Sequence, residues 1–452
     1  MQHYLTKLLE PRANGPEITT LFASLLNVKI SALTLTKEIE EHADYPSLLS
    51  ISDVLNTYGI ENLAVKFDIT RFAELPAPFI TQITVLKSDI KFFTIVREIK
   101  EEIVYFFDPE RHNWRALAKS DFLQRCTGVA LFAEAEENAG EKDYGKNLKK
   151  EKKKNALNHL AAFCMPVVVA IAGIVALTQD GSSALLPFVF SILTLVGTAV
   201  GALLLLYELD QHNPVLQQIC SGSKKVDCGA VLQSKAAKIA GISWSAIGFI
   251  YFMGLLLLLL LGGIASPSAL FVGAWMNALA VPYVVFSVYY QWRVVKQWCV
   301  LCLIVVTVLI LQLTIATIGG WHTLLRHHAI DPALLMQAIT AFAFPVIIAF
   351  LLIPALQKAK EGKRTHIELQ KLKHNKQIFA ALLPRQKLVT ENPDNLGIVM
   401  GNPNATFKLI KVCNPYCGPC AKAHSPIEAL LHNNPDLQVQ VIFTAKNDEK
   451  DP

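Results

Sequence analysis

Long runs of apolar residues dominate the middle of the chain, between residues 157 and 357. Each run approaches or exceeds the roughly 20 residues that a helix needs to cross the hydrocarbon core of a bilayer. Because a backbone in lipid must satisfy its hydrogen bonds within its own segment, each run is predicted to be a helix. The pattern predicts six membrane spans: 160–178, 184–207, two within 239–292 that are separated by a turn at 262–268, 299–319 and 333–356.

The two ends of the chain have the shorter patterns of soluble domains. Near the N-terminus, "SLLSISDVLNTYGI" has helical periodicity, and "FFTIVREI" and "EIVYFFDP" are typical of strands around a turn. Near the C-terminus, "FKLIKV" predicts a strand and "AKAHSPIEALL" a helix, after a basic helical arm at 368–383. We therefore predict a multidomain membrane protein, with a helical transmembrane bundle between an N-terminal α+β domain and a C-terminal α/β domain.

Composition and charge agree with a membrane protein. Hydrophobic residues make up 52% of the chain and charged residues only 17%, against about 25% charged in an ordinary soluble protein. The alternative, a large soluble protein with buried core helices, would need all of these uncharged runs by accident. The net charge of +5 comes largely from basic runs at 146–154 and 358–364. Because such runs beside membrane spans usually bind lipid headgroups, we predict a lipid partner and no nucleic-acid partner.

An even number of spans places both ends of the chain, and the loops 208–238 and 293–298, on one side of the membrane. Of the nine cysteines, only Cys164 falls inside a span, where a lone cysteine usually serves as a small apolar residue. The other eight fall in the same-side segments or at their edge: Cys126, Cys220, Cys228, Cys299, Cys302, Cys413, Cys417 and Cys420. The cysteines are therefore predicted to gather on one face of the membrane.

Six of these cysteines form three pairs, Cys220/Cys228 in a polar loop, Cys299/Cys302 at the rim of a span, and Cys417/Cys420 between the predicted C-terminal strand and helix. A Cys-x-x-Cys that ends a strand and opens a helix is the thioredoxin arrangement. Helix N-terminal amides stabilise a thiolate there, so Cys417 would attack and Cys420 would resolve. For Cys413, a buried structural role and a redox role stay open.

Zinc binding and structural disulfides are the alternatives for these pairs. The two Cys-x-x-Cys pairs are separated by 114 residues, and one of them begins a membrane span, so a four-thiolate zinc site is disfavoured and no metal is predicted. Thiol–disulfide exchange fits better, because it needs thiols that meet in sequence through mixed disulfides. We predict a relay from a soluble dithiol to the loop pair, then to the rim pair, and finally to a lipid-soluble quinone.

The stretch from about 184 to 320 resembles the vitamin K epoxide reductase family, in particular its bacterial members fused to a thioredoxin-like domain. The resemblance rests on "YELDQHNPVLQQIC", "VDCGAVLQSKAAKIAGISWSAIGFIYF" and "WCVLCLIVV". It implies a four-helix core and a quinone, ubiquinone or menaquinone, as electron acceptor. It also implies disulfide formation in reduced secreted or periplasmic proteins, with exported peptides as further candidate substrates.

Carried over by position, the resemblance implies roles for the cysteines of the two membrane-side pairs and for one serine. Cys220 would meet the partner domain, Cys228 would attack Cys299, and Cys302 would face the quinone. Ser234 matches a family hydroxyl near the active site, so Cys302 and Ser234 are the predicted quinone-binding residues. The chain departs from the family where members place Asn and Tyr against the quinone oxygens, because Trp244 and Val306 stand there.

Two arguments disagree on orientation. The short loops 179–183 and 264–267 carry no Lys or Arg while 146–154 is rich in Lys, which favours a cytoplasmic cysteine side. Disulfides, however, are made in the periplasm and opposed in the cytosol. Following the redox argument and the resemblance, we predict an inner-membrane protein with its redox cysteines facing the periplasm. Residues 1–30 lack the basic start and apolar core of a signal peptide.

The N-terminal domain resembles the papain-like peptidases that cut leader peptides in bacteriocin exporters. The resemblance rests on "YPSLLSISDVLNTYGIENLAV", "LPAPFI", "FFTIVREI", "VYFFDPE" and "DFLQRCTGVALFAEA". Residues 1–30 contain no Cys for a nucleophile, Lys91 stands where the family has His, and only Asp108 matches the catalytic set. Because a Cys–His nucleophile needs both partners, we predict a peptide-binding module, with Cys126 in packing. The alternative function, a membrane-bound leader-peptide peptidase or exporter component, also lacks a phosphate-binding Gly-Lys-Ser/Thr loop.

The region after Cys420 contains only 32 residues, which is enough for one helix and the strand "VQVIFTA". A complete thioredoxin fold would need more, so the sequence predicts a truncated thioredoxin-like domain. The predicted organisation is 1–140 degenerate cysteine peptidase-like domain, 141–156 basic linker, 157–182 extra membrane helix, 183–320 reductase-like membrane domain, 321–357 connecting membrane helix, 358–388 basic helical linker and 389–452 thioredoxin-like domain.

Overall fold

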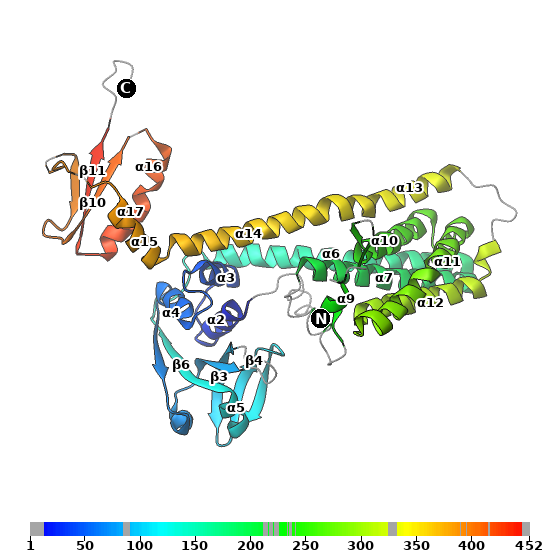
Figure 1. Cartoon of the computed structure of the whole chain (residues 1–452), viewed down its shortest axis with the longest axis horizontal. Coiled ribbons are helices and arrows are strands. Elements are labelled where there is room, and N and C mark those ends of the chain that lie inside the picture. The colour runs from blue at the N-terminus through cyan, green and yellow to red at the C-terminus, as the bar shows by residue number, and fades with distance from the viewer. Residues whose placement is uncertain are drawn as a thin grey trace, which may run out of the picture. The chain divides into compact units, whose positions relative to one another are not determined.

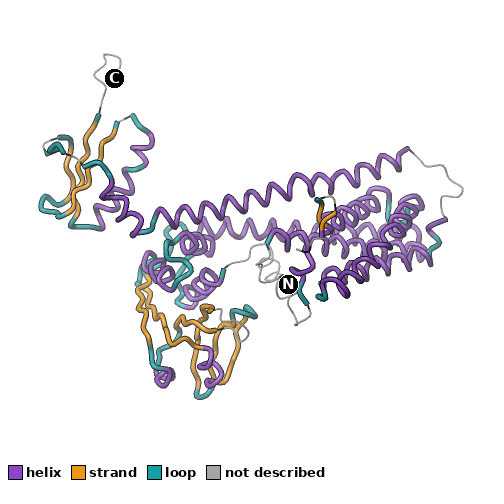
Figure 2. Tube along the Cα trace, in the orientation of Figure 1, coloured by secondary structure: helices purple, strands orange, loops and turns teal. Residues whose placement is uncertain are grey.

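The computed structural model divides into two compact units, Met1–Ile378 and Phe379–Pro452 (Figure 1). It describes residues 13–84, 91–210, 216, 220, 226–232, 234, 237–239, 241–323, 332–388, 390–394, 396–414 and 416–444. Strands lie in the N-terminal and C-terminal parts of the chain and in one short hairpin among the membrane helices (Figure 2).

The N-terminal part of the first unit is an antiparallel sheet of six strands in the order β1-β6-β2-β3-β4-β5. The strands are β1 (Ile60–Lys66), β2 (Phe79–Thr84), β3 (Lys91–Lys100), β4 (Ile103–Asp108), β5 (Asn113–Ala118) and β6 (Cys126–Ala135). The two strands predicted around a turn are β3 and β4. Successive side chains of a strand point to opposite faces, and both faces of this sheet carry buried residues.

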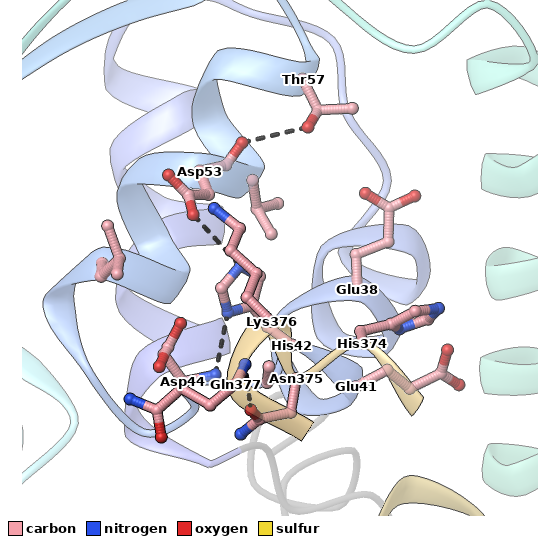
Figure 3. Close-up of a pocket in the computed structure, with 13 residues that line it drawn as sticks. Glu38, Glu41, His42, Asp44, Asp53, Thr57, His374, Asn375, Lys376 and Gln377 are labelled. Carbon is pink, nitrogen blue, oxygen red and sulfur yellow. Dashed lines mark hydrogen bonds and ion pairs between the residues drawn. The ribbon is translucent and has the colours of Figure 1, made fainter. Parts of the chain in front are cut away.

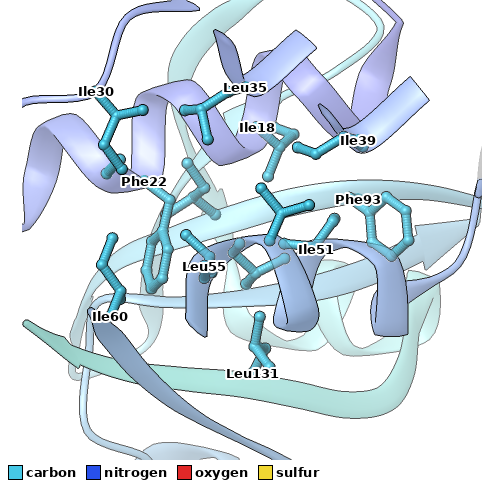
Figure 4. Packing of buried hydrophobic residues seen from close by; sticks show 14 of the residues in the cluster. Ile18, Phe22, Ile30, Leu35, Ile39, Ile51, Leu55, Ile60, Phe93 and Leu131 are labelled. Carbon is cyan, nitrogen blue, oxygen red and sulfur yellow. The ribbon is translucent and has the colours of Figure 1, made fainter. Parts of the chain in front are cut away.

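Three helices cover one face of the sheet: α2 (Asn14–Leu25), α3 (Ala32–Glu41) and α4 (Leu48–Thr57). Ser31 and Ser47 cap α3 and α4, because their hydroxyls accept the backbone N–H groups of Thr34 and Ser50 at 3.4 and 3.3 Å. The core beneath the helices is apolar and buried (Figure 4): Ile18, Phe22, Ile30, Leu35, Ile39, Ile51, Leu55, Ile60, Phe93 and Leu131. On the other face, the 3₁₀ turn Ile69–Glu74 and α5 (Lys119–Arg125) cover a second apolar cluster that contains Phe72 and Phe122.

The rest of the first unit is helical. Its long helices are α6 (Tyr144–Asp180), α7 (Leu185–Leu209), α10 (Trp244–Gly262), α11 (Pro267–Tyr289), α12 (Val300–Ile318), α13 (Pro332–Ile347) and α14 (Ile353–Lys373). Shorter elements are α9 (Cys228–Leu232), the hairpin β7 (Lys238–Ile239) and β8 (Ile242–Ser243), a π-helical turn at Tyr290–Val295 after α11, and a second at Ile348–Leu352 between α13 and α14. A further short helix, α15 (Lys376–Leu382), includes the boundary between the two units.

Five helical segments among the described residues are long and apolar enough to span a membrane: Tyr144–Leu209, Trp244–Gly262, Pro267–Val295, Val300–Ile318 and Pro332–Lys373. The prediction of a multidomain membrane protein is confirmed. The predicted spans 160–178 and 184–207 both fall in the first segment, where the 3₁₀ turn Gly181–Ala184 divides α6 from α7. The count of six spans stays a prediction.

Apolar side chains are exposed along the outer helices, as a lipid environment requires. Ile171 and Ile174 of α6 and Leu335 and Ile339 of α13 each expose more than half of their surface, at 57%, 59%, 59% and 61%. In water such surfaces would be unfavourable, whereas in a bilayer they contact acyl chains.

The second unit is a three-stranded sheet in the order β10-β11-β9, with β10 (Phe407–Cys413) parallel to β11 (Leu437–Phe443) and β9 (Ile398–Gly401) antiparallel to it. The chain between the parallel strands forms α16 (Gly418–Lys422) and α17 (His424–Asn433). The predicted strand, helix and strand are therefore present, while the thioredoxin-like assignment of this unit stays a prediction.

Close contact between α7 and α10 depends on glycine, because a Cβ at Gly201 would lie 3.0 Å from Phe249 Cα and 3.2 Å from Phe249 N. Small residues let membrane helices approach this closely. We expect Gly201→Leu to destabilise the bundle by about 1–3 kcal/mol, as overpacking does, and to lower the thermal unfolding midpoint in detergent. Gly362→Leu in α14 is the control, since nothing lies within 4 Å of a Cβ there; equal midpoints would contradict the packing argument.

Candidate functional site

A parallel bridge between Val226 and Trp298 brings the loop cysteines to the rim of α12. The N–H of Asp227 donates to the carbonyl oxygen of Trp298 at 3.1 Å. Cys299 directly follows Trp298, and Cys228 follows Asp227 in the loop. The bridge therefore holds Cys228 of the loop pair close to Cys299 of the rim pair.

Four cysteine side chains form a continuous file at this point. The Cys228 sulfur is in hydrogen-bonding contact with both Cys220 and Cys299, and the Cys302 N–H donates to the Cys299 sulfur at 3.4 Å. All four residues are buried, and all are free thiols. The structure thus brings the predicted loop and rim pairs together in the order Cys220, Cys228, Cys299, Cys302.

The environment of Cys228 stabilises a thiolate. Hydrogen bonds from the Cys220 and Cys299 thiols, together with the N–H groups of Val300 and Leu301 at the start of α12, lower the pKa of Cys228 to about 3. These amides have no partner within their own helix and lie at its positive end. The pKa of Cys220 is raised instead, because its thiol donates to Cys228 and is buried. The negative charge of the loop pair therefore resides on Cys228.

Gln291 holds the rim pair in place, and sequence analysis missed it. Its carboxamide oxygen accepts the Cys299 N–H at 2.8 Å, and its amide nitrogen donates to the Ser287 hydroxyl at 3.0 Å. Gln291 lies in the π-helical turn after α11 and is 1% exposed. Nothing in its local sequence distinguishes it, because the partner backbone is eight residues away and is reached only after the chain turns at Lys296 (φ 57°).

An apolar cavity of about 740 Å³ adjoins Cys302 between α10, α11 and α12. Trp244 lines it beside Tyr283 and Phe286, with ring centroids 5.0 and 5.8 Å away. Cavities of this size, apolar with a few polar groups, are typical of small-molecule sites. Cys302 of the rim pair is one of the residues that line this cavity.

The residues that the sequence analysis singled out for quinone binding do not all line the same cavity. Ser234 lines a smaller cavity of about 40 Å³ that also touches Cys302, Trp244 and Gln291, and its hydroxyl donates to the Val231 carbonyl at 2.7 Å. Trp244 lines both cavities, and Val306 is buried within α12. Ser234 is thus near Cys302 as expected, on the side of the loop.

The third pair lies in the second unit, at the start of a helix as predicted. Cys417 precedes α16, and hydrogen bonds from the Cys420 thiol and the Cys420 N–H lower its pKa. The pKa of Cys420 is raised, first by that same hydrogen bond. Cys413 at the end of β10 is buried against Val439 and Val441, in agreement with a packing role.

In the N-terminal domain, hydrogen bonds join α2 to β3, and the residues considered for a peptidase site have different surroundings. The Asn14 amide donates to the Phe93 carbonyl at 2.9 Å, and the Phe93 N–H donates to the Asn14 side-chain oxygen at 2.6 Å. Lys91 is the exposed first residue of β3, and Asp108 is buried with Arg115 3.0 Å away. Cys126 lies 3.4 Å from the Thr81 hydroxyl. Asn14, Asp108 and Cys126 therefore make contacts within the domain.

A second cavity, of about 790 Å³, was not anticipated by the sequence (Figure 3). It is lined mainly by polar residues of α3, α4 and the loops beside them, together with residues 374–377. His42 anchors it: its Nε2 lies 3.3 Å from Asp53, and its Nδ1 accepts the Asp44 N–H at 3.2 Å. The cavity contains no cysteine.

Two protein families match separate parts of the chain. Residues 188–317 match the Vitamin K epoxide reductase family, and residues 18–138 match the Peptidase C39 family. Both resemblances predicted from the sequence are confirmed, and the first match includes all four cysteines of the file. No curated protein matches the chain.

Among solved structures, the peptidase domain of Streptococcus ComA, a bi-functional ABC transporter involved in a quorum sensing pathway, is 20% identical. That alignment covers 28% of this chain and 94% of that domain, with a TM-score of 0.25. A double glycine motif protease from an AMS/PCAT transporter, in complex with the leader peptide, is 14% identical over 28% of this chain and 89% of that one, with a TM-score of 0.25.

Gln291→Met should remove the acceptor for the Cys299 N–H with little change in volume. An unsatisfied buried donor costs about 1–3 kcal/mol, so we expect a lower unfolding midpoint and faster alkylation of Cys299 as the start of α12 loosens. Peptide-resolved mass spectrometry after timed labelling measures the second effect. Gln357→Met on exposed α14 is the control, and identical behaviour of the two variants would refute the role of Gln291.

Cys417 should react with iodoacetamide at lower pH than an ordinary thiol, whose pKa is about 8.5. A lowered pKa leaves more thiolate at neutral pH, so the midpoint of its pH–rate profile should lie below that value. Cys420→Ala removes the leading cause of the shift and should raise the midpoint. The profile is measured on the Cys417 peptide by mass spectrometry, and an unshifted midpoint in the variant contradicts the assignment.

Proposed function

We propose that the chain is a membrane thiol oxidase that passes electron pairs from protein dithiols to a quinone, ubiquinone or menaquinone. The family match supports the assignment as a membrane disulfide oxidoreductase. Electron transfer to a quinone is supported by the file of four cysteines, which leads from the loop to the wall of an apolar cavity.

The cycle begins with both pairs oxidised. A substrate thiolate attacks the Cys220 sulfur and releases the Cys228 thiolate, and the second substrate thiol then displaces Cys220 to leave a substrate disulfide. Attack on a disulfide through a mixed disulfide is the general route of such exchange. The N–H groups of Val300 and Leu301, which hydrogen-bond to the Cys228 sulfur, favour its release as the thiolate leaving group.

Cys228 then transfers the electron pair inward. Its thiolate attacks Cys299 in the Cys299–Cys302 disulfide and releases Cys302, after which Cys220 attacks Cys228, restores the loop disulfide and releases Cys299. The rim dithiol would then return to the disulfide by giving up two electrons and two protons, and a quinone held beside Cys302 would supply the acceptor for them. Contact of Cys228 with both Cys220 and Cys299 supports its central position.

The residues around Cys302 fit such an acceptor. The cavity is lined mostly by apolar and aromatic residues. Cys302 faces the cavity, and Ser234 lies on its loop side.

In this proposal, the domains on either side of the membrane bundle bring substrates to the four cysteines. Cys417 and Cys420 of a thioredoxin-like unit oxidise client thiols and are reoxidised at Cys220, with Cys417 as the attacking thiolate. The chain crosses an inner membrane six times, with the cysteines on the periplasmic side. The N-terminal domain binds exported peptides without cutting them, since Asn14 ties α2 to β3 where the sequence offers no Cys nucleophile.

The deciding experiment measures oxidation of a reduced peptide by purified full-length protein, with ubiquinone and menaquinone compared. Cys302→Ser should reduce the quinone-dependent rate by about 10²-fold or more, because the rim disulfide can no longer form. Cys164→Ser, in the exposed part of α6, should retain the rate. A rate that survives Cys302→Ser would refute the relay.

A further inference from the structure

The C-terminal end of α7 carries negative charge where a helix favours positive charge. The last carbonyl oxygens of a helix have no partner within it and form its negative end, so Lys and Arg are favoured there. The last turn of α7 contains Glu208 and no basic residue, and Asp210 follows as the cap. A cation from elsewhere in the chain would therefore stabilise this end.

Lys360 of α14 supplies that cation. Its amine donates to the carbonyl oxygen of Leu209 at 3.1 Å and lies 3.0 Å from the Asp210 carboxylate. One side chain thus satisfies a terminal carbonyl of α7 and neutralises the carboxylate beside it. Because the hydrogen bond joins residues 151 positions apart in sequence, it depends on the way α14 lies against the bundle.

The same end of α7 forms part of the surroundings of the loop pair. Leu204 and Tyr207 of α7 are buried in one apolar cluster with Cys220 and Cys228. The chain leaves α7 at Asp210, ten residues before Cys220. Helix ends fray readily, so a loose last turn of α7 would disturb both the side chains that pack against the loop pair and the start of its loop.

In sequence, Cys220 lies between two points at which the backbone is held. The bridge between Val226 and Trp298 holds the chain just before Cys228, and Lys360 holds the chain where it leaves α7. Two fixed ends restrict the positions open to Cys220, and this raises the effective concentration of its thiol at the Cys228 sulfur.

Other basic residues of α14 contact the N-terminal domain instead. Lys363 lies 3.6 Å from Glu40, and the Lys371 amine donates to the Tyr45 carbonyl oxygen at 3.2 Å. Lys360 differs from them in its partner, which is the membrane bundle. The position of this one lysine on α14 therefore matters more than the total charge of the helix.

We propose that Lys360 is a positioning residue for the loop pair, an assignment that rests on the proposed function. By holding the end of α7, it keeps the Cys220 sulfur within reach of Cys228. In the resolving step, the Cys220 thiolate attacks Cys228 in the Cys228–Cys299 disulfide, the Cys220–Cys228 disulfide forms, and Cys299 leaves as a thiolate. Lys360 acts on this step through the position of Cys220.

The test measures the equilibrium between the Cys220–Cys228 dithiol and its disulfide in glutathione redox buffers. The parent is the full-length protein in nanodiscs with Cys299→Ala and Cys302→Ala, so that the loop pair cannot exchange with the rim pair. Lys360→Met should lower the equilibrium constant for disulfide formation about two- to fivefold, the range expected for one exposed charged contact. Lys360→Arg should retain the constant. Alkylation and peptide-resolved mass spectrometry quantify both forms.

Lys358→Met, at an exposed position of the same helix, is the matched control. A lower constant in Lys360→Met alone, with an unchanged unfolding midpoint, supports the assignment. A constant equal to that of the parent overturns it and leaves the proposed function standing. An equal fall in both Met variants also overturns it, because the cause would then be the charge of α14 as a whole. If the parent forms no Cys220–Cys228 disulfide even in oxidised glutathione, the proposed function fails, and this assignment with it.

Discussion

The redox arrangement depends on one short contact, the parallel bridge that joins Val226 to Trp298. Without it, the loop that carries Cys228 would have no fixed position relative to α12. With it, the Cys228 sulfur meets the Cys299 thiol and the free amides of the first turn of α12 at once. The start of α12 therefore carries Cys299 and supplies the amides that stabilise a thiolate at Cys228. This single bridge brings together a loop pair and a rim pair of cysteines that are far apart in sequence.

Much of this could be predicted from the sequence, because lipid imposes strong rules on composition and length. Apolar runs long enough to cross a bilayer must be helices, and the described helices α10, α11 and α12 follow the predicted runs. The cysteine spacing likewise placed Cys299 at a helix start and Cys417 before α16. These features are local, since each depends on residues that are neighbours in the chain.

The residues that the sequence did not reveal act across the bundle. Gln291 accepts the backbone N–H of Cys299, which lies eight residues away and comes within reach only after the chain turns at Lys296. In the N-terminal domain, the sequence predicts that a catalytic cysteine is missing, but it does not reveal how α2 is joined to the sheet. Only the fold shows that Asn14 bonds both backbone groups of Phe93 and so joins helix to strand.

A layer of polar side chains below the cavity links the site to the packing of the membrane helices. Gln312 of α12 donates to the Thr194 hydroxyl of α7 at 2.9 Å, and the Asn277 amide of α11 contacts the Gln312 side-chain oxygen at 3.4 Å. Polar groups buried in a membrane bundle cost free energy unless they pair across helices, so such pairs fix the register of one helix against another. Asn277 also donates to the carbonyl of Leu309, which lines the cavity. The contacts that set helix register thus also position part of the wall of the cavity beside Cys302.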